Sequence, residues 1–109
     1  MKSLVNGSME ANSEVNLVIE MVGGEPYEYY PLGDHIVRAT GVCGGRPTFK
    51  YTRIDVDFIL NKLAHGCTVS YLVDAYRDSH LTEAAIQEAI TLARSAFKLS
   101  YQTPLPAIV

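Results

Sequence analysis

The chain has 109 residues, of which 48% are hydrophobic, with two cysteines and a formal net charge of −3. This length and apolar content suffice for one compact domain, which excludes the small classes that need disulfides or a metal to fold. The apolar segments are far shorter than the roughly 20 residues of a membrane helix, and the acidic N-terminal segment is unlike a signal peptide. We therefore expect a cytoplasmic protein in which Cys43 and Cys67 are free thiols.

The charge is distributed unevenly along the chain. Residues 1–34 contain one lysine and six acidic residues, whereas residues 35–109 contain eight lysines and arginines and six acidic residues. The second part is therefore only mildly basic. Because domains that grip nucleic acid through phosphates usually carry a larger cationic excess, this charge permits a nucleic-acid partner without favouring one.

Residues 1–26 are predicted to form a leader that is partly disordered, because their first part is polar and has no periodicity. Within this leader, the evenly apolar segment 15–22 favours a strand over a helical turn. The Gly-Gly pair at 23–24 then interrupts it.

Residues 27–54 are rich in aromatic and β-branched side chains and are punctuated by turns, which is typical of short strands. We predict that residues 35–40 pair with residues 47–50 across the glycine-rich turn between them. Such a hairpin is only marginally stable alone, so it must pack on other elements.

From residue 55 onward, apolar residues recur about every 3.6 positions instead of every two. This periodicity predicts three helices over residues 55–100. Asp55 is expected to cap the first helix and Gly66 to end it, while Thr68 and Thr82 are expected to cap the second and third. The predicted core faces are Val56, Ile59, Leu60 and Leu63 in the first helix, Val69, Leu72, Val73 and Tyr76 in the second, and Ala85, Ile86, Ala89, Ile90, Ala93 and Phe97 in the third.

Short connections between these helices predict that they cross rather than form a long bundle. The fold class that follows is mainly α, with a three-helix core of helix-turn-helix type and a small N-terminal β-hairpin or sheet, all in one compact domain over residues 27–100. Residues 101–109 contain two prolines and are predicted to form an extended tail that docks on its own domain or on a partner.

No catalytic apparatus is indicated by the residues. The glycine-rich turn at 41–45 lacks the Lys-Ser/Thr pair and the following helix of a phosphate loop, so a structural turn is favoured. The spacing of the cysteines and histidines matches no usual metal site, and no nucleophile can be paired with a base. Glu83 and Glu88 are assigned to the solvated outer face of the third helix. We expect a protein that is not an enzyme and that binds no metal or cofactor.

Five residues are candidates for contact with DNA. Four could form a shallow cationic patch, and the alternative is scattered surface charge in which Arg53 pairs with Asp55 or Asp57. The fifth could read a base from the third helix, although Glu83 and Glu88 beside it would oppose phosphates. The candidates are Arg46, Lys50, Arg53 and Lys62 for the patch and Gln87 for the base contact.

The segment from residue 42 to residue 93 closely resembles the bacterial "domain of unknown function 433" family. That family shows a Gly-Gly-Arg/Lys-Pro turn, a Gly-Thr-Arg-Ile step, an apolar helix ending near Gly, a short helix ending at Tyr, and Leu-Thr before a third helix. Tyr51 departs from the pattern, because members usually have glycine there. The matching residues are Gly44, Gly45, Arg46, Pro47, Thr52, Arg53, Ile54, Gly66, Tyr76, Leu81 and Thr82.

The resemblance implies a homeodomain-like helix-turn-helix core, and some members resemble the DNA-binding part of antitoxins that pair with PIN-domain ribonuclease toxins. The hypothesis that follows is an antitoxin-like, DNA-binding homodimer that also contacts a PIN-domain toxin. The alternative is a protein–protein interaction domain that does not bind DNA, because fold does not fix function.

Overall fold

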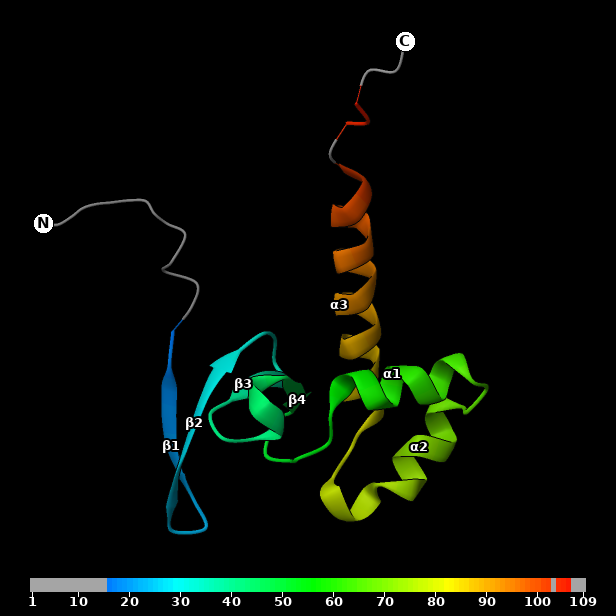
Figure 1. The fold of residues 1–109 in the computed structure, drawn as a ribbon. Coiled ribbons are helices and arrows are strands. Elements are labelled where there is room, and N and C mark those ends of the chain that lie inside the picture. Colours follow the sequence, from blue (N-terminus) through cyan, green and yellow to red (C-terminus); the bar gives the residue numbers. More distant parts are fainter. Residues whose placement is uncertain (1–15, 103, 107–109) are drawn as a thin grey trace, which may run out of the picture.

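The computed structural model describes residues 16–102 and 104–106 of the chain. Strands fill the first half of this part and helices fill the second, as Figure 1 shows. The first 15 residues of the predicted leader, and residues 103 and 107–109 of the predicted tail, lie outside the described residues. The elements are β1 (Val18–Val22), β2 (Glu25–Pro31), β3 (Ile36–Ala39), the 3-10 turn η3 (Cys43–Gly45), β4 (Pro47–Phe49), α1 (Val56–Ala64), α2 (Val69–Ala75), the 3-10 turn η4 (Arg77–Ser79) and α3 (Glu83–Gln102).

The four described strands form one antiparallel sheet in the order β1-β2-β3-β4. A two-residue turn joins β1 to β2, and its residues Gly23 and Gly24 have φ angles of +59° and +84°. Positive φ at both positions is what the tight type I′ hairpin turn requires, and glycine adopts it without strain. The strand predicted within 15–22 and the pairing of β3 with β4 are confirmed, with Val37 opposite Thr48.

The predicted fold class is wrong. The described residues form a full four-stranded sheet beside three α-helices, rather than a mainly α protein with a small hairpin. The prediction failed because the tyrosine-rich β2 shows no simple alternation of polar and apolar residues, and because β1 and β2 are stabilised by pairing with each other. The stability of paired strands depends on packing against neighbours across the sheet, which a single segment of sequence does not show.

The three helices begin where the sequence predicts. Asp55, Thr68 and Thr82 stand immediately before α1, α2 and α3, and each side-chain oxygen accepts a hydrogen bond from a backbone N–H of the first turn, at 2.8, 3.0 and 3.2 Å. These bonds satisfy N–H groups that have no partner within the helix. The helical starts are therefore fixed by local chemistry.

The main core lies where the three helices meet β3 and β4. Ile86 of α3 is fully buried there, together with Ile59 of α1 and Leu72 of α2. Ile36 and Phe49, which face each other across β3 and β4, close this core from the sheet side. A smaller cluster on the opposite face of the sheet contains Tyr29, Val37 and Ala39. The sheet is thus covered by helices only at its β3–β4 end.

Glu88 of α3 links the helices to the connection between β2 and β3. Its carboxylate accepts hydrogen bonds from the backbone N–H groups of Asp34 and His35, at 2.7 and 2.6 Å. Gly33 allows this approach, because a Cβ at that position would overlap the Glu88 carboxylate. The expectation that Glu88 lies on a solvated outer face is therefore wrong, whereas Glu83 is exposed as expected.

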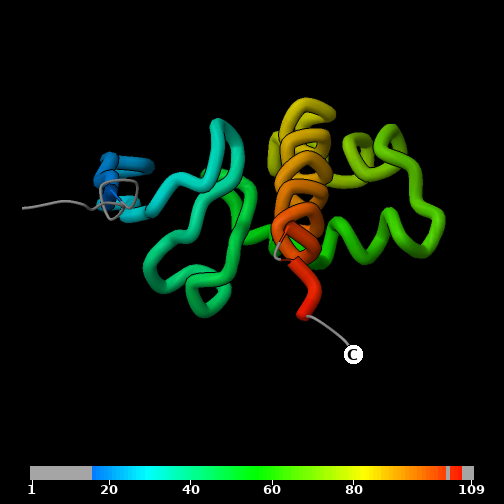
Figure 2. The backbone as a smooth tube through the Cα atoms, turned by 90° about the horizontal axis from the view of Figure 1, so that it is seen from above, coloured from blue at the N-terminus to red at the C-terminus, as the bar shows by residue number. Residues whose placement is uncertain are grey.

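The C-terminal half of α3 projects beyond the rest of the domain (Figures 1 and 2). The buried residues of α3 end at Ala89, and the helix continues to Gln102, two residues into the predicted tail. The expectation that Phe97 belongs to the core is wrong, since its side chain is 68% exposed. Periodicity identified the apolar side of the helix correctly, but α1 and α2 are too short to cover it along its whole length.

Candidate functional site

The five residues that were predicted to contact DNA lie in different surroundings. The Lys50 ammonium lies 5.0 Å from the centre of the Tyr29 ring and 5.1 Å from that of Tyr51. The Lys62 ammonium lies 5.2 Å from the centre of the Phe58 ring on α1. Cation–π contacts of this type favour the observed side-chain positions. Gln87 is exposed on the first half of α3, and Arg53 is exposed just before α1.

Arg46 is paired with the residue that caps α1. Its Nε lies 2.7 Å from a carboxylate oxygen of Asp55, while the other carboxylate oxygen accepts the N–H of Asp57. The hydrogen bond from Arg46 lowers the pKa of Asp55 from its usual range, and Asp55 in turn raises the pKa of Arg46. The ion pair that forms at this turn involves Arg46 rather than Arg53.

The Arg46–Asp55 pair makes stability depend on pH in a predictable direction. Because the folded-state pKa of Asp55 lies below its ordinary value of 3.8, its contribution is fully present above that value and is lost as the pH falls below it. Asp55→Asn keeps a good N-cap but removes the charge. We expect this variant to be less stable than the native chain at pH 7 and to lose less stability below about pH 4.

Urea denaturation at a series of pH values between 7 and 2 measures this difference. Asp57→Asn is the matched control, since it removes a carboxylate from the same helical turn without breaking the ion pair with Arg46. The prediction would be contradicted if the free energy of unfolding decreased as steeply at acidic pH in Asp55→Asn as in the native chain.

A polar cluster ties β1 to the turn after β4. Glu20 accepts hydrogen bonds from the hydroxyl groups of Tyr29 and Tyr51, at 2.6 and 2.7 Å, and these bonds lower the pKa of Glu20. The same bonds raise the pKa values of the two tyrosines. The backbone N–H of Tyr51 donates to the Tyr27 hydroxyl. With its polar groups satisfied in this way, the cluster has a structural role.

Tyr51 occupies a backbone position that favours glycine. Its φ is +68°, in the left-handed region that disfavours side chains with a Cβ. This explains why a related sequence would carry glycine there. The hydrogen bonds from the Tyr51 hydroxyl and backbone N–H offset the strain in this chain.

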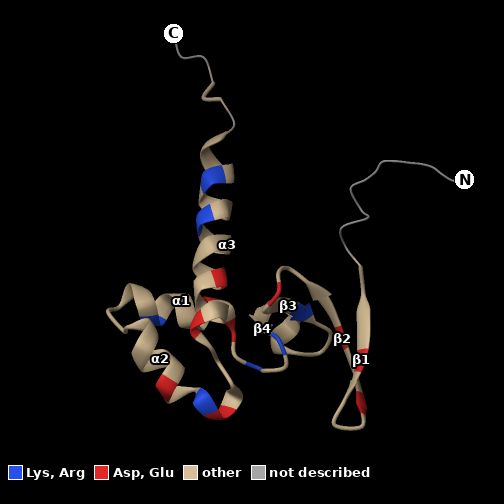
Figure 3. Cartoon of the chain, turned by 180° about the vertical axis from the view of Figure 1, so that it is seen from behind, with Lys and Arg blue, Asp and Glu red and all other residues tan. Residues whose placement is uncertain are grey.

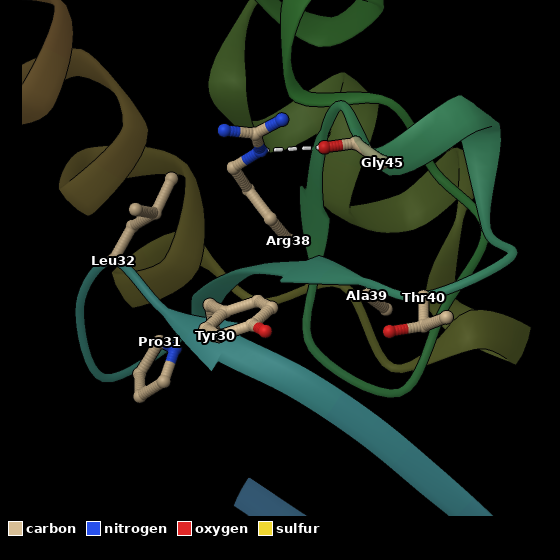
Figure 4. Close-up of a pocket in the computed structure, with 7 residues that line it drawn as sticks. All are labelled: Tyr30, Pro31, Leu32, Arg38, Ala39, Thr40 and Gly45. Atoms are coloured by element: carbon tan, nitrogen blue, oxygen red, sulfur yellow. Dashed lines mark hydrogen bonds between the residues drawn. The ribbon is translucent and has the colours of Figure 1, made fainter. Parts of the chain in front are cut away.

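An apolar pocket of about 550 Å³ lies on the sheet, lined by parts of β2, β3 and η3. Figure 4 shows Leu32 and Arg38 standing on the same side of the sheet, with Tyr30 beside them. Arg38 is held by a hydrogen bond of 2.6 Å from its Nε to the carbonyl oxygen of Gly45. The lining residues are Tyr30, Pro31, Leu32, Arg38, Ala39, Thr40 and Gly45.

Two surfaces carry most of the exposed large apolar side chains. The first, which we call the projecting end, is residues 93–102 of α3, where Phe97, Leu99 and Tyr101 are 68%, 67% and 61% exposed. The second, which we call the hairpin face, is the side of β1 and β2 that carries Ile19, Met21 and Tyr30, extended by the neighbouring Leu32. On it, Ile19 and Met21 are 59% and 69% exposed.

Sequence reasoning missed both surfaces. It placed the residues of β1 in a leader and Phe97 in the core. The alternation of Ile19 and Met21 with Val18 and Glu20 was the signal that could have identified a two-sided strand.

Within residues 16–102 and 104–106, no group of three or more histidine, cysteine, aspartate or glutamate side chains is placed to hold a metal ion. Both cysteines in this part of the chain are half-buried free thiols, and Cys43 donates to the Arg53 carbonyl oxygen at 3.3 Å. The helices among these residues include none with the length and apolar content needed to cross a bilayer.

Comparison with known proteins identifies a family but no individual relative. Neither the curated proteins nor the solved structures give a match to this chain. A family model described as "Protein of unknown function (DUF433)" matches residues 36–93, more than half of the chain. The match extends from the start of β3 into α3, so β1, β2 and residues 94–102 of α3 lie outside it. The chain therefore belongs to the DUF433 family, whose function is unknown.

Proposed function

We propose that this chain is a non-catalytic, cytoplasmic protein–protein interaction domain that binds its partner through the projecting end. The observation that supports this proposal is the apolar side of α3, whose buried residues end at Ala89 but which continues as exposed side chains to Tyr101. Ile90, Ala93 and Phe97 line a groove with Leu60 and Leu63 of α1, yet the Phe97 side chain is 68% exposed. Tyr101 is not among the residues that line this groove and is 61% exposed.

Exposed apolar side chains that adjoin one another are typical of protein interfaces. Phe97 and Tyr101 are one helical turn apart, and their rings contact edge to face with centres 5.4 Å apart. Aromatic residues of this kind are enriched at protein interfaces and often contribute most of the binding energy. A contiguous apolar patch at the end of a projecting helix therefore favours a protein partner.

A DNA-binding, antitoxin-like regulator that acts as a homodimer with a PIN-domain toxin is the second candidate. The exposure of Gln87 near the start of α3, after a short helix and turn, favours it. The acidic residues Asp74, Asp78 and Glu83 lie near the same end of α3 and would repel phosphates. Arg46, Lys50 and Lys62 are engaged with other side chains, which also weakens this candidate.

Photo-crosslinking in cells tests the first candidate. A photo-reactive amino acid at Tyr101, which is 61% exposed, should form adducts with protein, whereas the same group at Tyr71 of α2, which is 62% exposed, should not. The two sites have similar exposure, so chance collisions are matched. Equal labelling at both positions, or none at position 101, would count against the proposal.

Fluorescence anisotropy tests the second candidate. A labelled duplex from the upstream region of the gene is compared with a scrambled duplex, at low and near-physiological salt. Tighter binding to the native duplex that survives salt, and that is lost when Arg46, Lys50 and Arg53 are reversed in charge, would support a regulator. Weak binding to both duplexes that salt abolishes would exclude it.

A further inference from the structure

We infer that the pocket on the sheet binds a small aromatic carboxylate, with the carboxylate held by Arg38 and the ring against Tyr30 and Leu32. This is a second site, on β2 and β3, and it does not depend on the projecting end. Its volume of about 550 Å³ lies within the range of pockets that take small organic molecules. Such pockets are mainly apolar and contain a few polar groups that orient the ligand.

The apolar part of the pocket and its cation lie on the same face of the sheet. Tyr30 of β2 is directly opposite Arg38 of β3 in the strand pairing. Leu32 follows Tyr30 by two residues, and Figure 4 shows its side chain standing on the same side as that of Arg38. The Tyr30 and Leu32 side chains are 37% and 43% exposed. A ligand in the pocket can therefore contact both apolar side chains and the guanidinium at once.

One edge of the Arg38 guanidinium is fixed and the other is free. Its Nε donates a hydrogen bond of 2.6 Å to the carbonyl oxygen of Gly45, which orients the plane of the group. The two terminal nitrogens have no hydrogen-bond or ion-pair partner among residues 16–102 and 104–106. Parallel N–H groups on this edge match the two oxygens of a carboxylate. The free edge therefore favours an anionic ligand.

The charges near the pocket favour a ligand with one negative charge. Arg38 is the only lysine or arginine between residues 16 and 45, and Figure 3 shows acidic positions along β1 and β2. Of these, Glu28 lies on the face of the pocket, because it is opposite Ile19. It forms no ion pair with Arg38. A phosphate monoester carries a charge of about −1.5 to −2, which Glu28 would repel more strongly than a carboxylate.

Two parts of the chain contribute different properties to the site. Arg38 and Gly45 belong to residues 36–93, which match the family model, whereas Tyr30 and Leu32 lie before them. The glycine-rich turn at 41–45 supplies the carbonyl oxygen that holds Arg38. We therefore expect the family segment to bind the carboxylate and β2 to set the preference for the rest of the ligand.

Titration of the full chain with 2-naphthoate, followed by nuclear magnetic resonance, tests the inference. The matched probe is 2-naphthamide, which has the same rings without the negative charge. We expect 2-naphthoate to shift the amide signals of Ala39, Thr40 and Gly45 but not those of α2. The amide should bind at least about tenfold more weakly, because it lacks the charge-assisted hydrogen bonds. Equal affinity of the two probes, or no binding of 2-naphthoate at about 1 mM, would overturn the inference.

Substitutions at exposed positions assign the contacts. Arg38→Gln should weaken the binding of 2-naphthoate at least about tenfold and leave that of 2-naphthamide unchanged. Leu32→Ser should weaken the binding of both probes. Arg94→Gln is the matched control, because it removes the same charge from an exposed position on α3 and should change neither affinity. Undiminished binding of 2-naphthoate to Arg38→Gln would show that Arg38 does not hold the carboxylate.

Competition distinguishes an aromatic carboxylate from an anion alone. Benzoate should displace 2-naphthoate, whereas inorganic phosphate at the same concentration should not. Equal displacement by phosphate would overturn the assignment of the ligand class. The photo-crosslink at Tyr101 should be the same in the native chain and in Arg38→Gln. Loss of ligand binding with an intact crosslink would therefore count against this inference alone, and the reverse would count against the proposed function alone.

Discussion

Replacing Ile86 by alanine is expected to lower the free energy of unfolding by about 2–5 kcal/mol, the largest loss that we predict for this chain. Ile86 is completely buried in the cluster that joins the three helices to β3 and β4. The substitution removes apolar contacts and leaves a cavity between elements that cannot all move to fill it. Urea denaturation followed by circular dichroism measures the change.

Tyr71→Ala is the control for this experiment. It also removes a large apolar side chain from a helix, but from a position that is 62% exposed. We expect a change of less than about 0.5 kcal/mol there, as for most surface positions. A loss below about 1 kcal/mol for Ile86→Ala would show that the core described here does not hold the helices to the sheet.

Glu88→Ala is expected to lower the free energy of unfolding by about 1–3 kcal/mol, because it removes two charge-assisted hydrogen bonds to backbone N–H groups. These bonds connect α3 to the loop before β3 through Asp34 and His35. Hydrogen exchange followed by nuclear magnetic resonance should show faster exchange at both amides. The change should be local, with little effect on the caps of α1 and α2.

Glu83→Ala provides the comparison, since Glu83 is an exposed glutamate in the first turn of the same helix. Its removal should cost only the small interaction with the helix dipole. Equal exchange rates at residues 34 and 35 in the native chain and in Glu88→Ala would contradict the assigned contact.

The helices could be predicted from the sequence because their signals are local. Asp55, Thr68 and Thr82 cap the helices from adjacent positions, and the apolar period of 3.6 is contained within each segment. The sheet was underestimated because its evidence is not local. Tyr29 becomes a buried strand residue only when β1, β3 and the Glu20 carboxylate surround it.

For the candidate site, the sequence predicted which residues are apolar or charged but not how they are arranged in space. The sequence showed which side of α3 is apolar but not that its neighbours end before Phe97. It also grouped Arg46, Lys50 and Lys62 by their order in the chain, although each is held by a different side chain. Glu88 and His35 belong to different elements of the fold. The hydrogen bond between them therefore produces no pattern within a short segment of the sequence.

The close approach of Glu88 to Gly33 restricts how this protein can change by mutation. A residue with a side chain at position 33 would displace the carboxylate that holds the neighbouring amides. Loss of the carboxylate, in turn, would remove the contact that makes glycine necessary there. The two positions are therefore expected to change together in evolution. A substitution at either one is tolerated best when the other has already changed.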